Sequence, residues 1–136
     1  MRKRIITCGL LIVSIVLVIA LIGCSDKAMS YSWSTTGESH DVQADSWTIL
    51  AKTVDGHASR NVEMSSDNLK AIHIENTNTV GSVFLVVTQG KTEETYTITG
   101  PFSGGIDTSM FSPGKLTLRV NFEKAENVSL VITWYF

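Results

Sequence analysis

The residue types of a hydrolytic triad stand next to one another at Ser39-His40-Asp41. In hydrolases of this kind the serine, the histidine and the acid come from separate elements, and the fold brings them together. The chain also lacks the Gly-x-Ser-x-Gly elbow that exposes the nucleophile in many esterases, and it offers no recognisable pair of an acid and a base. We therefore interpret residues 39–41 as a polar loop, and we predict no catalytic residue and no enzyme activity.

Metal ligands are the second kind of chemistry to consider. The three histidines, His40, His57 and His73, match no zinc spacing, and no free cysteine accompanies them. Calcium binds carboxylate oxygens in loops, and five aspartates lie in or near expected loops: Asp41, Asp45, Asp55, Asp67 and Asp107. No Asp-x-Asp-x-Asp-Gly loop is present, and aspartate also forms turns without any metal. A structural calcium ion stays open on this pattern, and we predict no metal site and no cofactor.

Residues 100–105, Gly-Pro-Phe-Ser-Gly-Gly, form a glycine-rich segment. A phosphate-binding loop needs a helix after it and usually a lysine, and neither follows here. The segment is therefore predicted to be a flexible loop between strands, at the rim of a binding face.

Exposed aromatic rings are the remaining candidates, because such rings stack on sugars and anchor protein interfaces. The chain supplies Trp33, Trp47 and Trp134 together with Tyr31 and Tyr135. Tyr135 alternates with its two aromatic neighbours along an expected strand, so it should point away from the core. We predict a ligand platform formed by Trp33, Trp47 and Tyr135. The competing interpretation is that these rings fill the core of a small β-domain.

The elements that would position these residues are strands. Apolar and polar residues alternate over residues 116–122 and 128–136, so each apolar set defines one buried face. Residues 83–87 are apolar on both faces, as in a central strand. Further strands are expected over three segments: 47–54, 69–76 and 95–99. The aromatic C-terminus is expected to dock into the core.

Turn residues separate these segments. Asp55-Gly56 is typical of a tight hairpin, since both positions tolerate positive φ, and residues 124–126 are short enough to join two antiparallel strands. Pro113-Gly114 suits a type II turn. Shorter breaks are expected at three places: residues 65–68, 76–78 and 89–90. The pattern predicts an all-β fold of about eight strands after an N-terminal signal helix: an antiparallel, jelly-roll-like β-sandwich, with a closed barrel as the alternative.

The first 22 residues carry a different pattern. Three cations at residues 2–4 precede an uncharged, largely apolar run over residues 5–22, which is the arrangement of a secretory signal. As a helix, this run would rise about 27 Å, close to the thickness of a bilayer core, so an uncleaved transmembrane anchor is the alternative. Both interpretations place the rest of the chain outside the cytoplasm.

The end of this run resembles the lipobox of bacterial lipoproteins, because Leu21, Ile22 and the small residue Gly23 precede Cys24. The resemblance implies recognition of Leu21, Ile22 and Gly23 by the signal peptidase, cleavage before Cys24 and lipidation of the Cys24 sulfur, often with a further acyl chain such as palmitate. Two or more acyl chains hold a protein stably on a membrane. The predicted organisation is a signal peptide at 1–23, a lipidated cysteine with a tether at 24–28 and a β-sandwich domain at 29–136.

Charge narrows the range of partners. Residues 1–23 hold three of the eleven lysines and arginines, so the remaining chain has eight cations against thirteen acids, a net charge of −5. This balance argues against binding of nucleic acid or of an anionic lipid surface through a basic face.

The alternation of apolar and polar residues over residues 29–35 predicts a first strand, so that the fold starts at Met29. If the fold starts at Trp47 instead, residues 25–45 form a polar stalk.

The sequence thus predicts a binding module that is held on the cell membrane by lipid and faces outward. Its expected ligand is a glycan or another cell-wall component, and by analogy of fold alone it resembles carbohydrate-binding modules. The alternative is an envelope lipoprotein that acts as a structural subunit and binds an envelope protein.

Overall fold

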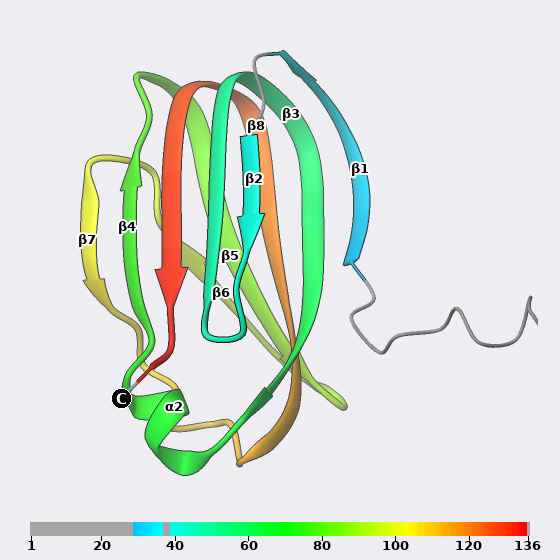
Figure 1. Ribbon diagram of the computed structural model, residues 1–136, viewed down its shortest axis with the longest axis vertical. Coiled ribbons are helices and arrows are strands. Elements are labelled where there is room, and N and C mark those ends of the chain that lie inside the picture. Colours follow the sequence, from blue (N-terminus) through cyan, green and yellow to red (C-terminus); the bar gives the residue numbers. More distant parts are fainter. Residues whose placement is uncertain (1–28, 37–38, 136) are drawn as a thin grey trace, which may run out of the picture.

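The computed structural model describes residues 29–36 and 39–135 (Figure 1). Within these residues the chain forms β-strands and one short helix, so the prediction of an all-β fold is confirmed. In chain order, the elements are the strands β1 (Met29–Thr36), β2 (Ser39–Val42) and β3 (Ser46–Met64), the helix α2 (Ser66–Lys70), and the strands β4 (His73–Thr77), β5 (Val80–Gln89), β6 (Thr92–Thr97), β7 (Phe102–Gly105) and β8 (Gly114–Thr133). Because β1 precedes Trp47 and pairs with β3, the alternative in which the fold starts only at Trp47 is wrong.

All eight strands pair antiparallel within one sheet. Two of them, β3 with 19 residues and β8 with 20, are far longer than the others and pair with each other along nearly their whole length. Their register shifts between Val54 and Gly56, which lie opposite Ala125 and Phe122. At this level both strands bend, and Figure 1 shows them arching together over the top of the molecule.

The bend divides the sheet into two halves. The front half-sheet consists of β7, β4, residues 125–133 of β8, residues 46–54 of β3, and β2. The rear half-sheet consists of β6, β5, residues 114–122 of β8, residues 56–64 of β3, and β1. Figure 1 shows β5 and β6 behind the strands of the front half-sheet. Buried side chains from both halves form one hydrophobic cluster, which is the main source of stability for the fold.

The hairpin predicted at residues 124–126 is wrong, because the chain only bends there and continues within β8. Buried positions in β8 follow every second residue up to Phe122, then fall at Ala125 and Val128, and follow every second residue again after that. Lys124 and Asn127 adopt positive φ angles of 48° and 51°. These residues rotate the strand so that its apolar side chains stay on the inner face. Residues 114–133 are therefore one bent strand.

Asp55-Gly56, also predicted to be a hairpin turn, lies inside β3 opposite this bend. Gly56 has a φ of 118°, which residues with a side chain rarely adopt. The Asp55 carboxylate accepts a hydrogen bond from the backbone N–H of Lys124 at 3.2 Å. The prediction of a reversal was wrong, because these residues bend two paired strands within the sheet.

Three shorter segments also differ from their predictions. The break at residues 65–68 starts α2 with a capping box in which Ser65 and Asn68 satisfy each other's backbone N–H groups. The strand expected over residues 69–76 therefore begins only at His73. The glycine-rich segment 100–105 is not a free loop, because it contains β7, which pairs with β4.

Of the aromatic C-terminus predicted to dock into the core, Trp134 does so, Tyr135 is exposed, and Phe136 lies outside the described residues. Trp134 is 2% exposed, and its backbone N–H donates a hydrogen bond to the backbone carbonyl of Asp45 at 2.9 Å. Its own carbonyl accepts one from Nδ2 of Asn68 at 2.6 Å. The guanidinium of Arg60 lies 4.9 Å from the centroid of the Trp134 ring. Trp134 therefore joins the turn between β2 and β3 to α2 and to the rear half-sheet.

Candidate functional site

The aromatic platform predicted from the sequence does not form. Trp47 is fully buried on the core side of β3, so its place in an exposed platform is wrong. Trp33 is half-buried, and its ring centroid lies 6.1 Å from that of Phe122 in the core. Tyr135 is 61% exposed, as its alternation predicted. Trp33 pairs with Gly56 at the bend, whereas Tyr135 follows the opposite end of β8, so these two rings do not face one ligand.

The histidines do not converge either. Residues 39–41 belong to β2, which pairs with β3, so the predicted polar loop is wrong; the side chains of these three residues lie outside the described part. His57 lies in the rear half-sheet, and His73 lies in the front half-sheet with its Nε2 3.6 Å from the Glu75 carboxylate. Among the described residues, no three histidine, cysteine, aspartate or glutamate side chains lie close enough to hold a metal ion.

The described aspartates support the backbone around them. Asp67 lies in the first turn of α2, and the carbonyl of Asp45 accepts the hydrogen bond from Trp134. The carboxylates of Asp55 and Asp107 accept hydrogen bonds from backbone N–H groups. These are the ordinary contacts of turn-forming residues.

The lipobox residues Leu21, Ile22, Gly23 and Cys24 lie outside the described residues, and lipidation stays a prediction. Over residues 29–36 and 39–135, the structure contains no helix with the length and apolar character needed to cross a membrane.

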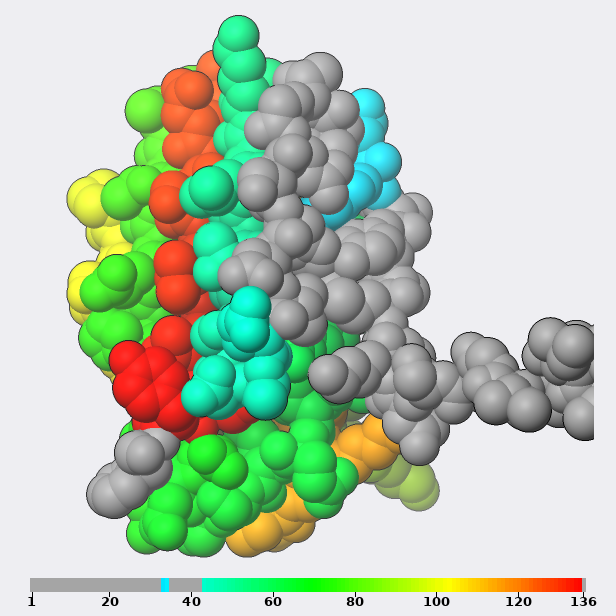
Figure 2. Space-filling model, in the orientation of Figure 1, coloured from blue at the N-terminus to red at the C-terminus, as the bar shows by residue number. Residues whose placement is uncertain are grey.

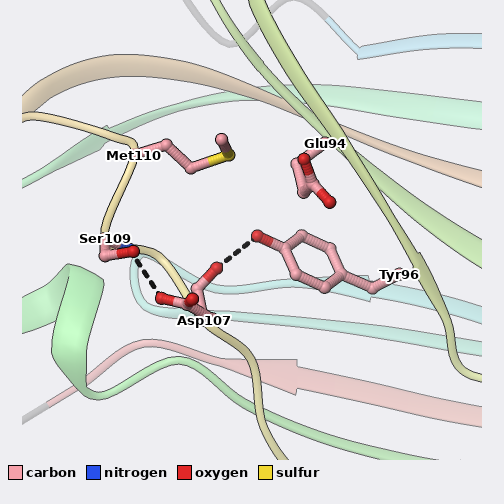
Figure 3. A pocket seen from close by; sticks show the side chains of 5 residues that line it. All are labelled: Glu94, Tyr96, Asp107, Ser109 and Met110. Atoms are coloured by element: carbon pink, nitrogen blue, oxygen red, sulfur yellow. Dashed lines mark hydrogen bonds between the residues drawn. The ribbon is translucent and has the colours of Figure 1, made fainter.

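A small pocket of about 240 Å³ lies beside the edge strand β6 and the segment between β7 and β8 (Figure 3). The Tyr96 hydroxyl donates a hydrogen bond to the Asp107 carbonyl, and the Asp107 carboxylate accepts one from the Ser109 N–H at 2.9 Å. Burial, followed by the charges of Glu94 and Asp107, raises the pKa of Tyr96, while hydrogen bonds from Ser109 lower the pKa of Asp107. The pocket is smaller than typical ligand sites, which start at about 300 Å³, so we interpret these contacts as closing the edge of the fold.

A larger hollow, the front groove, lies on the outer face of the front half-sheet, the face seen in Figure 2. Its volume is about 400 Å³, within the range of small-molecule sites. Strand pairing places Glu75 of β4 between Ser103 of β7 and Val131 of β8. The residues that line the groove are Glu75, Asn76, Thr77, Pro101, Phe102, Ser103, Ser129 and Val131.

An amide network fixes one wall of the front groove. Asn76, which is 1% exposed, donates hydrogen bonds to the carbonyl of Ile98 at 2.7 Å and to Oδ1 of Asn78 at 3.0 Å. Oδ1 of Asn78 also accepts the backbone N–H of Gly100 at 2.6 Å. A Cβ at Gly100 would lie 2.6 Å from the Asn78 backbone nitrogen, so a larger residue does not fit. The network therefore fixes the position at which the chain enters β7, and with it the position of Pro101 at the edge of the front groove.

The lining of the front groove combines hydrogen-bonding groups with apolar side chains. The Glu75 side chain is 67% exposed, and hydroxyl groups of Thr77, Ser103 and Ser129 line the same hollow. Val131 is half-buried on the same face and Pro101 is exposed beside it, whereas Phe102 pairs with Asn76 and packs against the core. Carboxylates accept and hydroxyls both donate and accept hydrogen bonds, while apolar side chains pack on the C–H groups of a ligand. This combination suits a ligand that carries several hydroxyl groups on a carbon ring.

No family model matches this chain. Its comparison with curated proteins finds no match either. The function therefore has to be argued from the residues of the front groove and their surroundings.

Sequence reasoning missed the front groove because its residues are far apart in the chain. Glu75, Ser103 and Ser129 come from three strands, and only the pairing of β4 with β7 and β8 brings them together. The period-two pattern indicates that Ser129 faces away from the core. It does not show which strand lies next to it.

Proposed function

We propose that this chain is a lipid-anchored, extracytoplasmic protein that binds a glycan or another hydroxyl-rich cell-wall component in the front groove. The Leu21-Ile22-Gly23-Cys24 segment supports the lipid anchor and the outward location. The proposed fold type is a jelly-roll-like β-sandwich, supported by two antiparallel half-sheets that share one core.

The observation that carries the proposal is the mixed lining of the front groove. A sugar ring has hydroxyl groups around its rim and C–H groups on its faces, so it needs polar partners and an apolar wall together. Glu75 and the neighbouring hydroxyls supply the first, and Pro101 with Val131 supplies the second. Hydrogen bonds from sugar hydroxyls to a carboxylate such as that of Glu75 are charge-assisted and stronger than neutral ones.

The test is a pull-down of the full-length protein, in detergent, by purified cell wall and by a panel of insoluble polysaccharides. Saturable depletion from solution by at least one material is expected. Glu75→Gln keeps the shape of the groove and removes the charge, so it should weaken binding about tenfold, the equivalent of one charge-assisted hydrogen bond. Glu123→Gln is the matched control, because it makes the same charge change on an exposed residue at the bend.

Two outcomes would contradict the proposal in different ways. If Glu75→Gln and the groove-filling variant Ser129→Tyr bind as well as the wild type, the ligand is not held in the front groove. If no material depletes the protein, the glycan itself is ruled out. The search would then move to an envelope protein, by cross-linking in intact membranes.

A further inference from the structure

Arg119 lies in the middle of the rear half-sheet, on its outer face, and no hydrogen bond to another described residue engages its guanidinium. Strand pairing places it between Ser59 of β3 and Val86 of β5. Its Nε atom is buried from solvent and makes no hydrogen bond. Among the described residues, no ion pair engages its guanidinium. Buried polar atoms without a partner are rare in folded proteins, so each one needs a specific explanation.

Arg60 provides a comparison, because its side chain makes contacts that stabilise the fold. Its two terminal nitrogens donate hydrogen bonds to the carbonyls of Ser46 at 2.8 Å and Gln43 at 2.6 Å. Its guanidinium also lies over the Trp134 ring. Arg119 has the same five N–H donors and none of these contacts. Stability of the fold therefore does not account for the charge of Arg119.

The polar side chains around Arg119 add donors. Asn121, two residues along β8, lies opposite His57 of β3 on the same face. Asn61 accepts a hydrogen bond from the Thr117 hydroxyl at 2.7 Å through its Oδ1, which leaves its Nδ2 group for another acceptor. Diagonal neighbours in an antiparallel pair lie about 7–8 Å apart, so His57 and Asn61 lie on either side of Arg119 along β3, and each is close enough to share one small group with the guanidinium.

An apolar floor lies next to these donors. Val86 alternates with the core residues of β5, so it points outward, yet it is only 2% exposed. Phe84, opposite Asn121, is half-buried. On the side of β6, the carboxylate of Glu93 accepts a hydrogen bond from the Thr88 hydroxyl at 3.3 Å. Low polarity beside the guanidinium strengthens its attraction for an incoming anion.

We propose that this outer face, centred on Arg119, is a binding site for an oxyanion, meaning a carboxylate or a phosphate group. A guanidinium offers two parallel N–H donors that match two oxygens of either group. Asn61 on one side of Arg119, or His57 with Asn121 on the other, supplies further donors for a ligand held by the guanidinium. The chain without residues 1–23 has a net charge of −5, so Arg119 is an isolated cation that recognises one anionic group and not a polyanion. The site lies on the opposite half-sheet from the front groove and does not depend on it.

The site is tested by NMR titration of the full-length protein in detergent micelles, with ¹⁵N-labelled arginine and asparagine. The Arg119 Nε–H signal is identified by its loss in Arg119→Lys. The probes are glucuronate for a carboxylate, glucose 1-phosphate for a phosphate, and glucose as the neutral control. A saturable shift of the Arg119 signal is expected with at least one of the anions and not with glucose. Arg119→Met should weaken binding at least tenfold, read from the Asn121 side-chain signals.

Lys52→Gln is the matched control, because Lys52 is an exposed cation in the front half-sheet. It should leave anion binding unchanged. A response to one anion alone assigns that group, and a response to both assigns oxyanions in general. No saturable shift with either anion up to tens of millimolar, or an equal response to glucose, would overturn the proposal.

Thermal unfolding gives a second readout that does not need a ligand. Because no partner uses the charge of Arg119, the Tm of Arg119→Met is expected to stay the same or to rise. A fall in Tm as large as that of Arg60→Met would show that Arg119 is structural and would overturn the proposal as well.

Discussion

Arg60→Met is the substitution that most directly tests how the two half-sheets are held together. Arg60 is 5% exposed, and its burial lowers the pKa of the guanidinium below its ordinary value. The side chain reaches from the rear half-sheet to the carbonyls of Ser46 and Gln43, at 2.8 and 2.6 Å, at the start of the front half-sheet. Methionine occupies a similar volume but donates no hydrogen bond. Both carbonyls lose this donor, and the Trp134 ring loses its cation.

The size of the effect follows from these contacts. Each hydrogen bond from a charged donor contributes about 1.5–3 kcal/mol, and a partly desolvated cation–π contact contributes about 1–2 kcal/mol. Part of this gain is offset, since the guanidinium must be kept out of water in the folded state. We expect the free energy of unfolding to fall by about 3 kcal/mol. For a domain of this size, that corresponds to a fall in Tm of roughly 10–15 °C.

The assay is thermal and urea unfolding of the wild type, Arg60→Met and Arg119→Met. Arg119→Met is the matched control, because it makes the same exchange on the neighbouring strand where the guanidinium has no partner. The urea m-value should stay constant, so that the change reports stability and not the extent of unfolding. A loss below about 0.5 kcal/mol in Arg60→Met, or equal losses in both variants, would refute the reasoning.

Three further substitutions probe separate features. Cys24→Ser should abolish incorporation of labelled palmitate, because serine has no thiol; persistent labelling would contradict the lipid anchor. Gly100→Ala should lower stability to urea by about 2 kcal/mol, since its Cβ would lie 2.6 Å from the Asn78 backbone nitrogen; a neutral result would show that the wall of the front groove can move. Tyr96→Phe should cost about 1 kcal/mol near neutral pH. The pKa of Tyr96 is raised from 10.0, so the stability that its hydroxyl contributes is complete below pH 10 and is lost as the pH rises through the raised pKa. The wild type should therefore lose more stability than Tyr96→Phe as the pH rises above 10. Equal losses in the two proteins would contradict this role.

The buried face of β8 shows what alternation alone can predict. Leu116 to Phe122 and Val128 to Ile132 are buried at every second residue, as the sequence pattern indicated. The sequence also marked the positions where the regular strand is interrupted, at residues 55–56 and 124–126. It did not show that these positions lie opposite each other, because that depends on the pairing of β3 with β8. Two turn signals that face each other bend a pair of strands, whereas each one read alone predicts a hairpin.

Trp47 was misassigned for a different reason. It belongs to the alternating set that continues through Ile49 and Ala51, and all three are buried. The prediction gave its aromatic character more weight than its phase in the strand, although the phase decides which side faces the core. Arg119 illustrates the converse, since its alternation with Leu118 and Val120 indicates that it faces outward. The lack of any partner becomes visible only once β3 and β5 are placed beside it.

The position of β1 connects the anchor to the two proposed sites. β1 starts at Met29 opposite Arg60 and runs toward the bend, so the chain enters the fold at the end away from the bend. If Cys24 carries lipid, the five residue steps from Cys24 to Met29 span at most about 18 Å. The start of the domain is then held close to the membrane. The front groove and the Arg119 face lie on the outer surfaces of opposite half-sheets. A ligand bound on one face therefore does not cover the other.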